Sequence, residues 1–532
     1  MLGLIILLPV LGSLIFFGIE NEDKTVSSTT IAQRNSIIKQ IGLAISLVTL
    51  FLTLILFSQM NNNVGGYQFT ETTAPFGFLG VDGISIYYVL LTAFITPIAL
   101  LSNWNDITYK LKYFVFSFLL LETLQLAFFC VADLFMFYVY FESVLIPLFI
   151  VVGVWGASEA RIRAAFLLFL YTLGGSLFML LAILWIMFNL GTSDFNYLSL
   201  FDLSVDSQGW AFFAFLLAFA IKSPLYPAHL WLFRAHAEAP VAGSIILAGV
   251  ILKLASYGFI RVLLNLFPEF CMHNQYIIQS IALLTLVYSS LVVIRQIDTK
   301  AIVAYSSVSH VAVMILGLFS NTLNGIEGSI LLSLAHGFVS PALFIFVGAF
   351  TYSRYHTRII NYYRGLALTM PLFAILFFVF SIFNAGAPLS LNFIGEFLAL
   401  SGTFHNSPFV GFIGATGIVF SAIYSIWLYN RITFLGYSPF FNRPVINSIR
   451  SGAKLPLGDL DRREFFLIIP LLIATVAFGL FPNTILESLH YPVSQLLINI
   501  DSSEFTRYIY FITPEFNNSD ALASISIIPE FE

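Results

Sequence analysis

Long apolar runs separated by short polar segments dominate the hydropathy pattern of this 532-residue chain. A helix that crosses a bilayer needs about 20 predominantly apolar residues. Counting runs of that length predicts an all-α membrane protein with about fourteen transmembrane helices. The predicted helices cover residues 1–18, 38–58, 84–102, 111–130, 133–155, 162–188, 210–231, 240–264, 276–295, 301–320, 326–351, 366–403, 409–434 and 464–484.

Two of these helices are expected to be broken. The seventh contains Pro224 and Pro227, and the twelfth is too long for one plain span and is interrupted from Asn384 to Pro388. Proline removes a backbone donor and clashes with the preceding turn. In transporters, broken helices at matching positions of two repeats indicate the transport site. We therefore expect two inverted five-helix repeats, helices 4–8 and 9–13, each with a break in its fourth helix.

The expected organisation has five parts. They are residues 1–105 with helices 1–3, residues 106–265 with the first repeat, residues 266–436 with the second repeat, residues 437–485 with a basic loop and helix 14, and a tail at 486–532. Within the tail, Ile485–Ile500 could form an amphipathic helix on the outer surface, before an acidic end that contacts partners.

Composition excludes several classes of protein. Hydrophobic residues make up 59% of the chain and charged residues only 10%, whereas soluble domains carry roughly 25% charged residues. The mean hydropathy of +0.91 agrees with a membrane protein and argues against a nucleic-acid partner. Cys130 and Cys271 are far apart and no CxxC is present, so no metal or disulfide framework is predicted. Phosphate-loop, dinucleotide-binding, HExxH and haem-attachment motifs are also missing.

The distribution of Lys and Arg tests the helix count. In the fourteen-helix topology, 19 of the 23 basic residues fall in loops on one side of the membrane. Lys222 and Lys253 lie within helices, and Arg261 and Arg507 fall on the other side. Such asymmetry follows the positive-inside rule. It predicts that both termini lie on the side opposite the basic loops.

Among the ionisable residues inside predicted helices, four lie at similar depth in long apolar runs and are singled out: Glu142, Lys222, Lys253 and Glu396. Intramembrane charges are costly and usually mark an ion or proton path. Glu142 and Lys222 are expected to form a pair, because a nearby carboxylate holds a buried lysine charged. Lys253 is expected to relay protons between the two repeats, and Glu396 to form the far end of the relay. A static, structural role is the alternative at each position.

Further residues could link or tune these four, because imidazole can accept a proton on one side and donate on the other. The candidates are His310, His336, His229 and Glu122. A packing role is again the alternative for each. For His236 and Glu238, at the junction of helices 7 and 8, we favour a structural role, since Glu238 before Pro240 is typical of a helix start.

Seven motifs follow one another within residues 75–485. They are Tyr138–Pro147, Gly153–Gly156, Ala235–Pro240, Arg295–Asp298, Ala304–Ser307, Gly325–Gly328 and Phe393–Glu396. Together they resemble the subunit 4 family of mitochondrial respiratory complex I, NADH:ubiquinone oxidoreductase, which is related to subunits of cation/proton antiporters. The resemblance assigns the glutamate–lysine pair to Glu142 and Lys222, the central lysine to Lys253 and the terminal glutamate to Glu396.

The resemblance also implies a setting. It implies a multi-pass protein of the mitochondrial inner membrane, with basic loops in the matrix and both termini in the intermembrane space. Flavin, iron–sulfur clusters and ubiquinone are expected in other subunits, with no cofactor in this chain. The expected partners are other membrane-arm subunits, including two related antiporter-like subunits, and lipids.

The sequence thus predicts a proton-translocating subunit that couples quinone reduction elsewhere to pumping through buried Glu, Lys, His and water. The alternative is a subunit of a cation/proton antiporter complex, which would use the same buried residues. A purely structural scaffold and a plastid relative of complex I are further alternatives. Copurifying flavin and iron–sulfur subunits would distinguish the first hypothesis from the antiporter.

Overall fold

A computed structural model describes residues 1–18, 28–73, 77–199, 205–434 and 458–512. Within these residues, eleven helices are long and apolar enough to span a membrane, and three shorter apolar helices occupy the remaining predicted positions. Each predicted span therefore has a counterpart in the same order along the chain, which confirms the expected all-α membrane fold.

The long spans comprise both single helices and composite ones. They are α2 (Ser28–Ser58), α3 (Ser85–Ser102), α4 (Leu111–Cys130), α5 with α6 (Leu134–Ser143, Leu145–Trp155), α7 (Arg161–Leu190), α11–η2–α12–η3–α13 (Val241–Ile246, Leu247–Ile251, Leu252–Gly258, Phe259–Leu263, Leu264–Leu266), α14 (Pro268–Arg295), α15 (Thr299–Leu318), α16–η4–α17 (Leu323–Phe344, Ile345–Thr351, Tyr352–Tyr355), α21 (Pro408–Thr433) and α23 (Arg462–Leu480).

Both predicted breaks are present. The shorter spans are α1 with η1 (Leu2–Leu14, Ile15–Gly18), α9 (Val205–Lys222), which continues after a break as α10 (Leu230–Glu238), and α19 (Pro371–Asn384), which continues after a break as α20 (Leu391–Asn406). The remaining helical segments are α8 (Phe195–Leu198), η5 (Ile360–Tyr362), α18 (Leu366–Thr369) and α24 (Asn483–Ile512).

Two features were not predicted. One is an antiparallel hairpin of β1 (Gln68–Thr73) and β2 (Gly77–Val81). The other is the π-helical geometry of η2, η3 and η4, which interrupts two central spans. A π-helical turn shifts the hydrogen-bond ladder and frees backbone groups, and such turns are frequent at functional sites.

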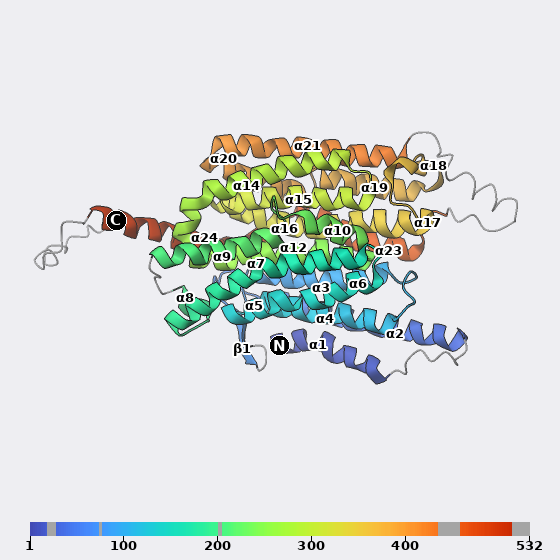
Figure 1. Ribbon diagram of the computed structural model, residues 1–532, viewed down its shortest axis with the longest axis horizontal. Coiled ribbons are helices and arrows are strands. Elements are labelled where there is room, and N and C mark those ends of the chain that lie inside the picture. Colours follow the sequence, from blue (N-terminus) through green and yellow to red (C-terminus); the bar gives the residue numbers. More distant parts are fainter. Residues whose placement is uncertain (19–27, 74–76, 200–204, 435–457, 513–532) are drawn as a thin grey trace, which may run out of the picture.

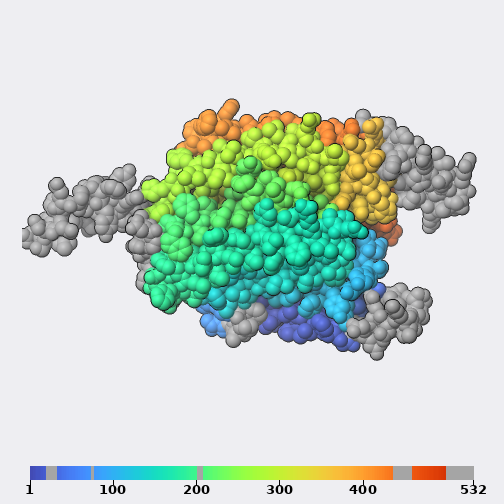
Figure 2. All heavy atoms as spheres, in the orientation of Figure 1, coloured from blue at the N-terminus to red at the C-terminus, as the bar shows by residue number. Residues whose placement is uncertain are grey.

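Burial separates a central layer of helices from a lipid-facing shell. In the most apolar 18-residue stretch of each span, all residues are buried in α15 and in α16–η4–α17 and 94% in α11–α13, whereas 28% are buried in α2 and 33% in each of α21 and α23. Figure 1 shows α12, α15 and α16 in the middle of the bundle, and the surface of the flank formed by α7 and α14 covers much of Figure 2. Large exposed side chains on that flank, such as Leu181 and Leu284, are suited to contact lipid.

The loops that follow odd-numbered spans meet at one end of the molecule, which we call the basic end. Direct contacts join them: Lys39 to the Trp104 carbonyl, Trp155 Nε1 to Tyr109 O at 2.9 Å, Ala157 N to Glu238 O at 2.8 Å, Arg358 to Glu238 at 3.3 Å and Gly365 N to Phe434 O at 3.0 Å. The alternation assumed from the charge pattern is therefore present. Lys24, Arg443, Arg450 and Lys454 lie outside the described residues.

The remaining connections meet at the opposite end. Their contacts are the bridges Leu79–Val131 and Asp133–Asp194, the hydrogen bonds of Asn321 and Asn406 to Gln275 at 3.1 and 3.0 Å, and Tyr87 OH to Thr484 O at 3.1 Å. Figure 1 shows α17 and α18 at one end and β1 and α8 at the other. Both ends of the bundle are thus held by interactions between loops distant in sequence.

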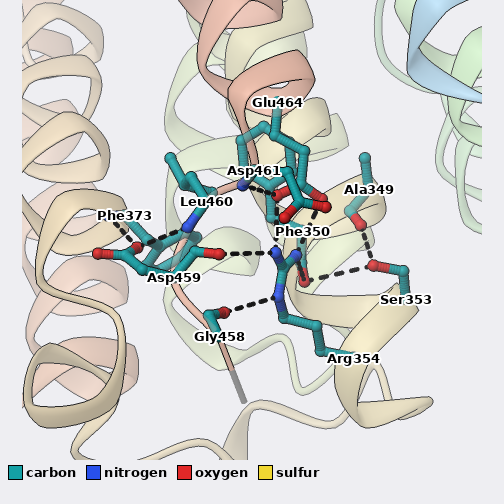
Figure 3. Close-up of polar contacts among 10 residues, drawn as sticks. All are labelled: Ala349, Phe350, Ser353, Arg354, Phe373, Gly458, Asp459, Leu460, Asp461 and Glu464. Carbon is teal, nitrogen blue, oxygen red and sulfur yellow. Dashed lines mark hydrogen bonds and ion pairs between the residues drawn. The ribbon is translucent and has the colours of Figure 1, made fainter. Parts of the chain in front are cut away.

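An ion pair at the basic end joins three spans. The Arg354 guanidinium donates to both carboxylate oxygens of Glu464, at 3.0 and 2.6 Å, and Glu464 also completes a capping box with Asp461 at the start of α23. Asp459 accepts hydrogen bonds from the backbone N–H groups of Leu372 and Phe373 at the start of α19. Figure 3 shows this cluster, which ties the end of α17 to the first turns of α19 and α23.

The amphipathic helix predicted at 485–500 is present within the longer α24. Ile485, Leu489 and Val493 are fully or almost fully buried, and their spacing places them on one stripe. This stripe packs on the bundle as the sequence pattern predicts. The end of the expected tail, from residue 513, lies outside the described residues.

Candidate functional site

The break after α9 places Lys222 at the last helical position before Pro224. The side chain is 1% exposed, and Nζ donates to the carbonyl oxygen of Phe141 at 2.9 Å. The ammonium also lies 3.8 Å from the centroid of the Phe141 ring. A backbone carbonyl and an aromatic face therefore replace part of the water that a lysine would otherwise bind.

Glu142 follows Phe141 in α5, so its carboxylate lies beside the lysine without bonding to it directly. The two charges interact electrostatically, and Ser176 of α7 lies next to the carboxylate. No ion pair within 4.0 Å joins these two described residues, and the buried oxygen Oε1 of Glu142 has no protein partner.

Lys253 lies in α12 immediately after the π-helical segment η2 and is fully buried. Its Nζ donates to Ala248 O at 2.7 Å, an acceptor within η2. It also lies 2.7 Å from Nδ1 of His336 in α16. The irregular turn thus provides one acceptor for the lysine, and a histidine from the second predicted repeat provides the other.

A second histidine continues the row. His310 of α15 lies beside His336, with ring centroids 5.9 Å apart, and its Nδ1 lies 2.9 Å from Glu396 Oε1. On its other side, Nε2 is 3.5 Å from the hydroxyl of Tyr424. Lys253, His336, His310 and Glu396 therefore form one buried cluster, which we call the central row.

Glu396 is positioned by the break between α19 and α20. Gly386 has a φ of +72°, and a Cβ at this position would meet Glu396 Oε2 at 2.5 Å. Ser390 caps α20 through its hydroxyl, which accepts from Phe393 N at 3.3 Å. The break therefore needs a glycine both for its backbone conformation and for the space that the carboxylate occupies.

The other candidates lie away from the central row. Glu122 is buried in α4 and accepts a hydrogen bond from Thr49 of α2 at 2.6 Å. His229 lies in the α9–α10 break, where its ring packs against those of Tyr226 and Tyr288 at 5.7 and 5.3 Å. Among the described residues, no hydrogen bond or ion pair joins Lys222 to Lys253, so the site has two separate clusters.

His236, for which the sequence favours a structural role, lies among the charged groups of the interior. Its ring is fully buried and stacked on Phe344 at 4.5 Å, and neither ring nitrogen has a partner among the described residues. Its charge would interact with those of Lys253 and Lys300. Lys300 is also buried, near the basic end, with Nζ 2.9 Å from Ala239 O. The Ala235–Pro240 motif held the signal, but the adjacent helix start favoured a structural interpretation.

The charged cluster around Lys300 reaches the surface of the basic end. Arg358 contacts Asp298 at 3.7 Å and Glu238 at 3.3 Å. Burial raises the pKa of the Asp298 carboxyl above its ordinary value, although the nearby Arg358 guanidinium opposes this shift. Titratable groups therefore extend from the membrane boundary toward His236 and the central row.

Residues 131–421 match the family described as NADH:quinone oxidoreductase/Mrp antiporter, TM. The chain is 52% identical over 501 residues to NADH-ubiquinone oxidoreductase chain 4 of Mycosarcoma maydis, covering 93% of this chain and 99% of that one. The chain belongs to the NADH-ubiquinone oxidoreductase chain 4 family. This result confirms the family predicted from the seven motifs.

Solved structures share the same fold as this member of the chain 4 family. One chain of respiratory complex I from Thermus thermophilus with bound NADH is 28% identical, with a TM-score of 0.80, covering 94% of this chain and 100% of that one. A chain of the Mrp complex from Dietzia sp. DQ12-45-1b is 19% identical, with a TM-score of 0.78, covering 96% and 99%. The second likeness concerns the fold alone.

The two cysteines lie on different helices. Cys130 and Cys271 are both buried, in α4 and α14. Within the described ranges, no group of three or more His, Cys, Asp or Glu side chains could hold a metal ion. The clustered groups are instead acids and bases that can exchange protons.

Proposed function

We propose that this chain is a proton-translocating, antiporter-like subunit in the membrane arm of NADH:ubiquinone oxidoreductase, in the mitochondrial inner membrane. The observation that carries the proposal is the central row, in which Lys253, His336, His310 and Glu396 are buried and linked across two helical sets. Apolar residues would pack at this depth at a lower free-energy cost. Packing alone therefore does not explain a row of acids and bases there.

Glu142 and Lys222 would sense the electrostatic state of the neighbouring subunit. Lys222 is held by a neutral carbonyl and an aromatic ring, so its charge depends strongly on the nearby carboxylate. When Glu142 gains or loses a proton, the balance between the neutral and charged lysine shifts. The change in charge at Lys222 then acts on Lys253, which is the next cation in the membrane interior.

In the central row, protons would pass between Lys253 Nζ and Glu396 through the two imidazoles. His336 contacts Lys253 with Nδ1, which leaves Nε2 free to exchange a proton on the other side. His310 reaches Glu396 with Nδ1. The two ring centroids are 5.9 Å apart. A proton would therefore pass from ring to ring in a favourable tautomer or through one water.

Proton uptake would follow the polar groups at the basic end. Lys300 and His236 lie on the way from the Arg358–Asp298–Glu238 cluster to Lys253, and both His236 ring nitrogens are unpaired within the described part of the chain. We propose that the basic end faces the matrix and that both termini lie in the intermembrane space, as the excess of positive charge favours.

The five-part organisation given above completes the proposal, with two inverted repeats at its centre. The breaks at α9–α10 and α19–α20 both fall in the fourth helix of a five-helix set, which supports the repeat. This chain would hold no redox centre, and flavin, iron–sulfur clusters and quinone would act in other subunits. The other membrane-arm subunits, among them two related antiporter-like chains, and lipids would be its partners.

A matched pair of glutamates tests the function. Glu396→Gln removes the charge at the end of the central row, whereas Glu327→Gln removes a buried carboxylate whose hydrogen-bond partner among the described residues is His490, at 3.1 Å. We expect Glu396→Gln complexes to assemble but to lose coupled proton translocation, measured in vesicles as NADH is oxidised. Glu327→Gln complexes should translocate normally. An assembled Glu396→Gln complex with an undiminished proton yield would contradict the proposal.

A second experiment distinguishes the proposed function from that of a cation/proton antiporter. The fold likeness to the Mrp complex favours it, but the identity of 52% to a chain 4 protein against 19% argues for the respiratory complex. Purification decides: copurified flavin and iron–sulfur subunits support the proposal. Sodium-dependent proton exchange by a complex without them would establish the antiporter instead.

A further inference from the structure

A line of hydroxyl groups leads from the central row toward the opposite end. The Tyr88 hydroxyl lies 2.8 Å from Ser333 Oγ, and Ser333 precedes His336 by three residues on the same helix. Ser256 lies beside the same tyrosine hydroxyl and three residues after Lys253. All of these side chains are buried.

The line continues along the span that contains Lys253. Tyr257 packs edge-on against the Tyr88 ring with centroids 5.6 Å apart. Its hydroxyl donates to Phe129 O at 3.4 Å and accepts from Arg261 Nε at 3.1 Å. Arg261 lies eight residues beyond Lys253, or about 12 Å along a helix. Half of the hydrocarbon core is about 15 Å thick, so Arg261 reaches the membrane boundary.

Arg261 ends this line in an ion pair with Asp82. The guanidinium lies over the rings of Tyr67 and Tyr257, at 4.9 and 5.5 Å. Burial raises the pKa of Tyr67 to about 12, so this phenol stays neutral. Arg261 lies within the π-helical segment η3 and retains 14% exposure, whereas Asp82 is 3% exposed.

The two carboxylate oxygens of Asp82 make different contacts. Oδ1 accepts from the backbone N–H groups of Ile84 and Ser85 at 3.2 and 2.7 Å and so caps the start of α3. Among the described residues, the hydrogen-bond partner of Oδ2 is Arg261. A cavity of about 130 Å³ adjoins the pair and is lined by polar groups that include Tyr67, Asn265 and Gln495. It has room for several waters.

We propose that protons leave the central row along this line, through the hydroxyls of Tyr88 and Tyr257, and that the Asp82–Arg261 ion pair is the exit valve. This inference rests on the proton-translocating function proposed above. Each hydroxyl oxygen accepts one proton and releases its own, so neither tyrosine changes charge, and a water carries the proton between the two hydroxyls. The proton then binds Asp82 Oδ2, and the neutral carboxyl loosens its pair with Arg261. Loss of that proton to water in the cavity restores the ion pair.

Restoring the pair closes the exit. The Arg261 guanidinium lies over two aromatic rings and repels a proton that approaches it while Asp82 is charged and paired. The same contacts would give a dry, static clamp if no proton crossed them, and the test distinguishes the two roles.

The test uses the assembled complex in vesicles and four variants. Tyr257→Phe removes only the hydroxyl, and Asp82→Asn removes the charge but keeps the Oδ1 acceptor that caps α3. Lys253→Met is the reference for a blocked central row. Glu464→Gln is the control, because it weakens a buried ion pair with Arg354 at the basic end, off the proposed line. The readouts are protons translocated per NADH and the rate of quinone reduction in uncoupled vesicles.

A positioned proton carrier typically contributes 10²–10⁴-fold to its transfer step, so each block should slow translocation by roughly a hundredfold. We expect Tyr257→Phe and Asp82→Asn to match the loss caused by Lys253→Met, while Glu464→Gln translocates normally. If Lys253→Met loses translocation but Tyr257→Phe does not, the exit route is wrong and the proposed function stands.

If Lys253→Met itself translocates normally, the proposed function fails as well. A comparable loss in Glu464→Gln would assign the effect to a general weakening of the bundle and would overturn the valve. Should Asp82→Asn fail to assemble, the result for Tyr257→Phe decides, since that variant removes no charge and no helix cap.

Discussion

The partners of Lys222 and Lys253 are uncharged groups, so each lysine can be either charged or neutral. A lysine at the centre of a helix costs about 2.5–3.5 kcal/mol on insertion scales. Lys222 offsets this cost with one carbonyl and one ring, and Lys253 with one carbonyl and one imidazole. Neither is locked in a direct bond to a carboxylate, which would hold it permanently charged. Such residues can change protonation when a neighbouring charge moves.

Gly386 gives a prediction at the residue scale. Gly386→Ala forces a Cβ to within 2.5 Å of Glu396 Oε2 and strains a backbone with φ of +72°. We expect a cost of about 1–2 kcal/mol for the backbone and, in addition, loss of proton translocation because the carboxylate is displaced from His310. Thermal unfolding and translocation measured in the same preparation check both parts.

Gly191→Ala is the matched control for that change. Gly191 ends α7 with φ of +71°, and nothing lies within 4 Å of the position that an added Cβ would take. It should lower stability by a similar amount and leave translocation intact. Equal translocation losses in the two variants would mean that backbone strain, and not the position of Glu396, causes the defect.

At the scale of elements, α16 and α20 approach each other through glycines. A Cβ at Gly328 would lie 2.3 Å from Ala399 N, and one at Gly395 would lie 2.6 Å from Leu332 N. Both obstacles are backbone atoms, which cannot rotate away. Small residues allow such close packing of membrane helices. The contact fixes α20, and with it Glu396, against the helix that carries His336.

Gly328→Ala should therefore separate the two helices and reduce both the yield of assembled complex and its thermal stability. Gly174→Ala, in α7, is the control, because nothing lies within 4 Å of the added Cβ. Alanine favours a helix over glycine by about 1 kcal/mol, so this control should be neutral or stabilising. A Gly328→Ala complex as stable as the control would show that the close approach of α16 and α20 is not needed.

The sequence could predict the spans and their breaks, because both depend on local composition: an apolar run of sufficient length, and Pro224 or Pro388 within it. The hairpin of β1 and β2 escaped prediction, since Gln68–Thr73 is short and polar and β2 is joined through Leu79 to Val131, which is distant in sequence. The π-helical segments are as apolar as any α-helical turn. Their geometry follows from packing between distant helices.

The candidate site was predictable as a set of residues but not as a set of contacts. Burying a charge in an apolar run is visible in the sequence, which singled out Glu142, Lys222, Lys253 and Glu396. The contact of His310 with Glu396 joins residues 86 positions apart. The carbonyl acceptors of Lys222 and Lys253 leave no trace in residue identity. Asp82 and Arg261 were missed as a pair because neither lies in the middle of a predicted span.

At the scale of the whole molecule, the clusters lie across the bundle, on helices from α5 to α20, instead of along any one of them. The central layer of α12, α15 and α16 carries Lys253, His310 and His336 of the row, α20 adds Glu396, and the shell of α7, α14 and α21 covers this layer. The two ends of the bundle differ in charge and in loop structure. A lateral row with distinct ends is suited to receive an electrostatic signal from one neighbour, pass it to another and move protons between two sides.

The orientation of these ends gives the last prediction. Glu159 is exposed at the basic end and Asn62 at the opposite end, and both native cysteines are buried, so new cysteines will dominate labelling. In sealed inner-membrane vesicles with the matrix side outward, a membrane-impermeant maleimide should label Glu159→Cys and spare Asn62→Cys. In mitochondria with a ruptured outer membrane the pattern should invert. Labelling of both in detergent controls for coverage by neighbouring subunits. The reverse pattern would place the basic end in the intermembrane space, and Lys300 and His236 would then lie on the release side while Asp82 and Arg261 lay on the uptake side.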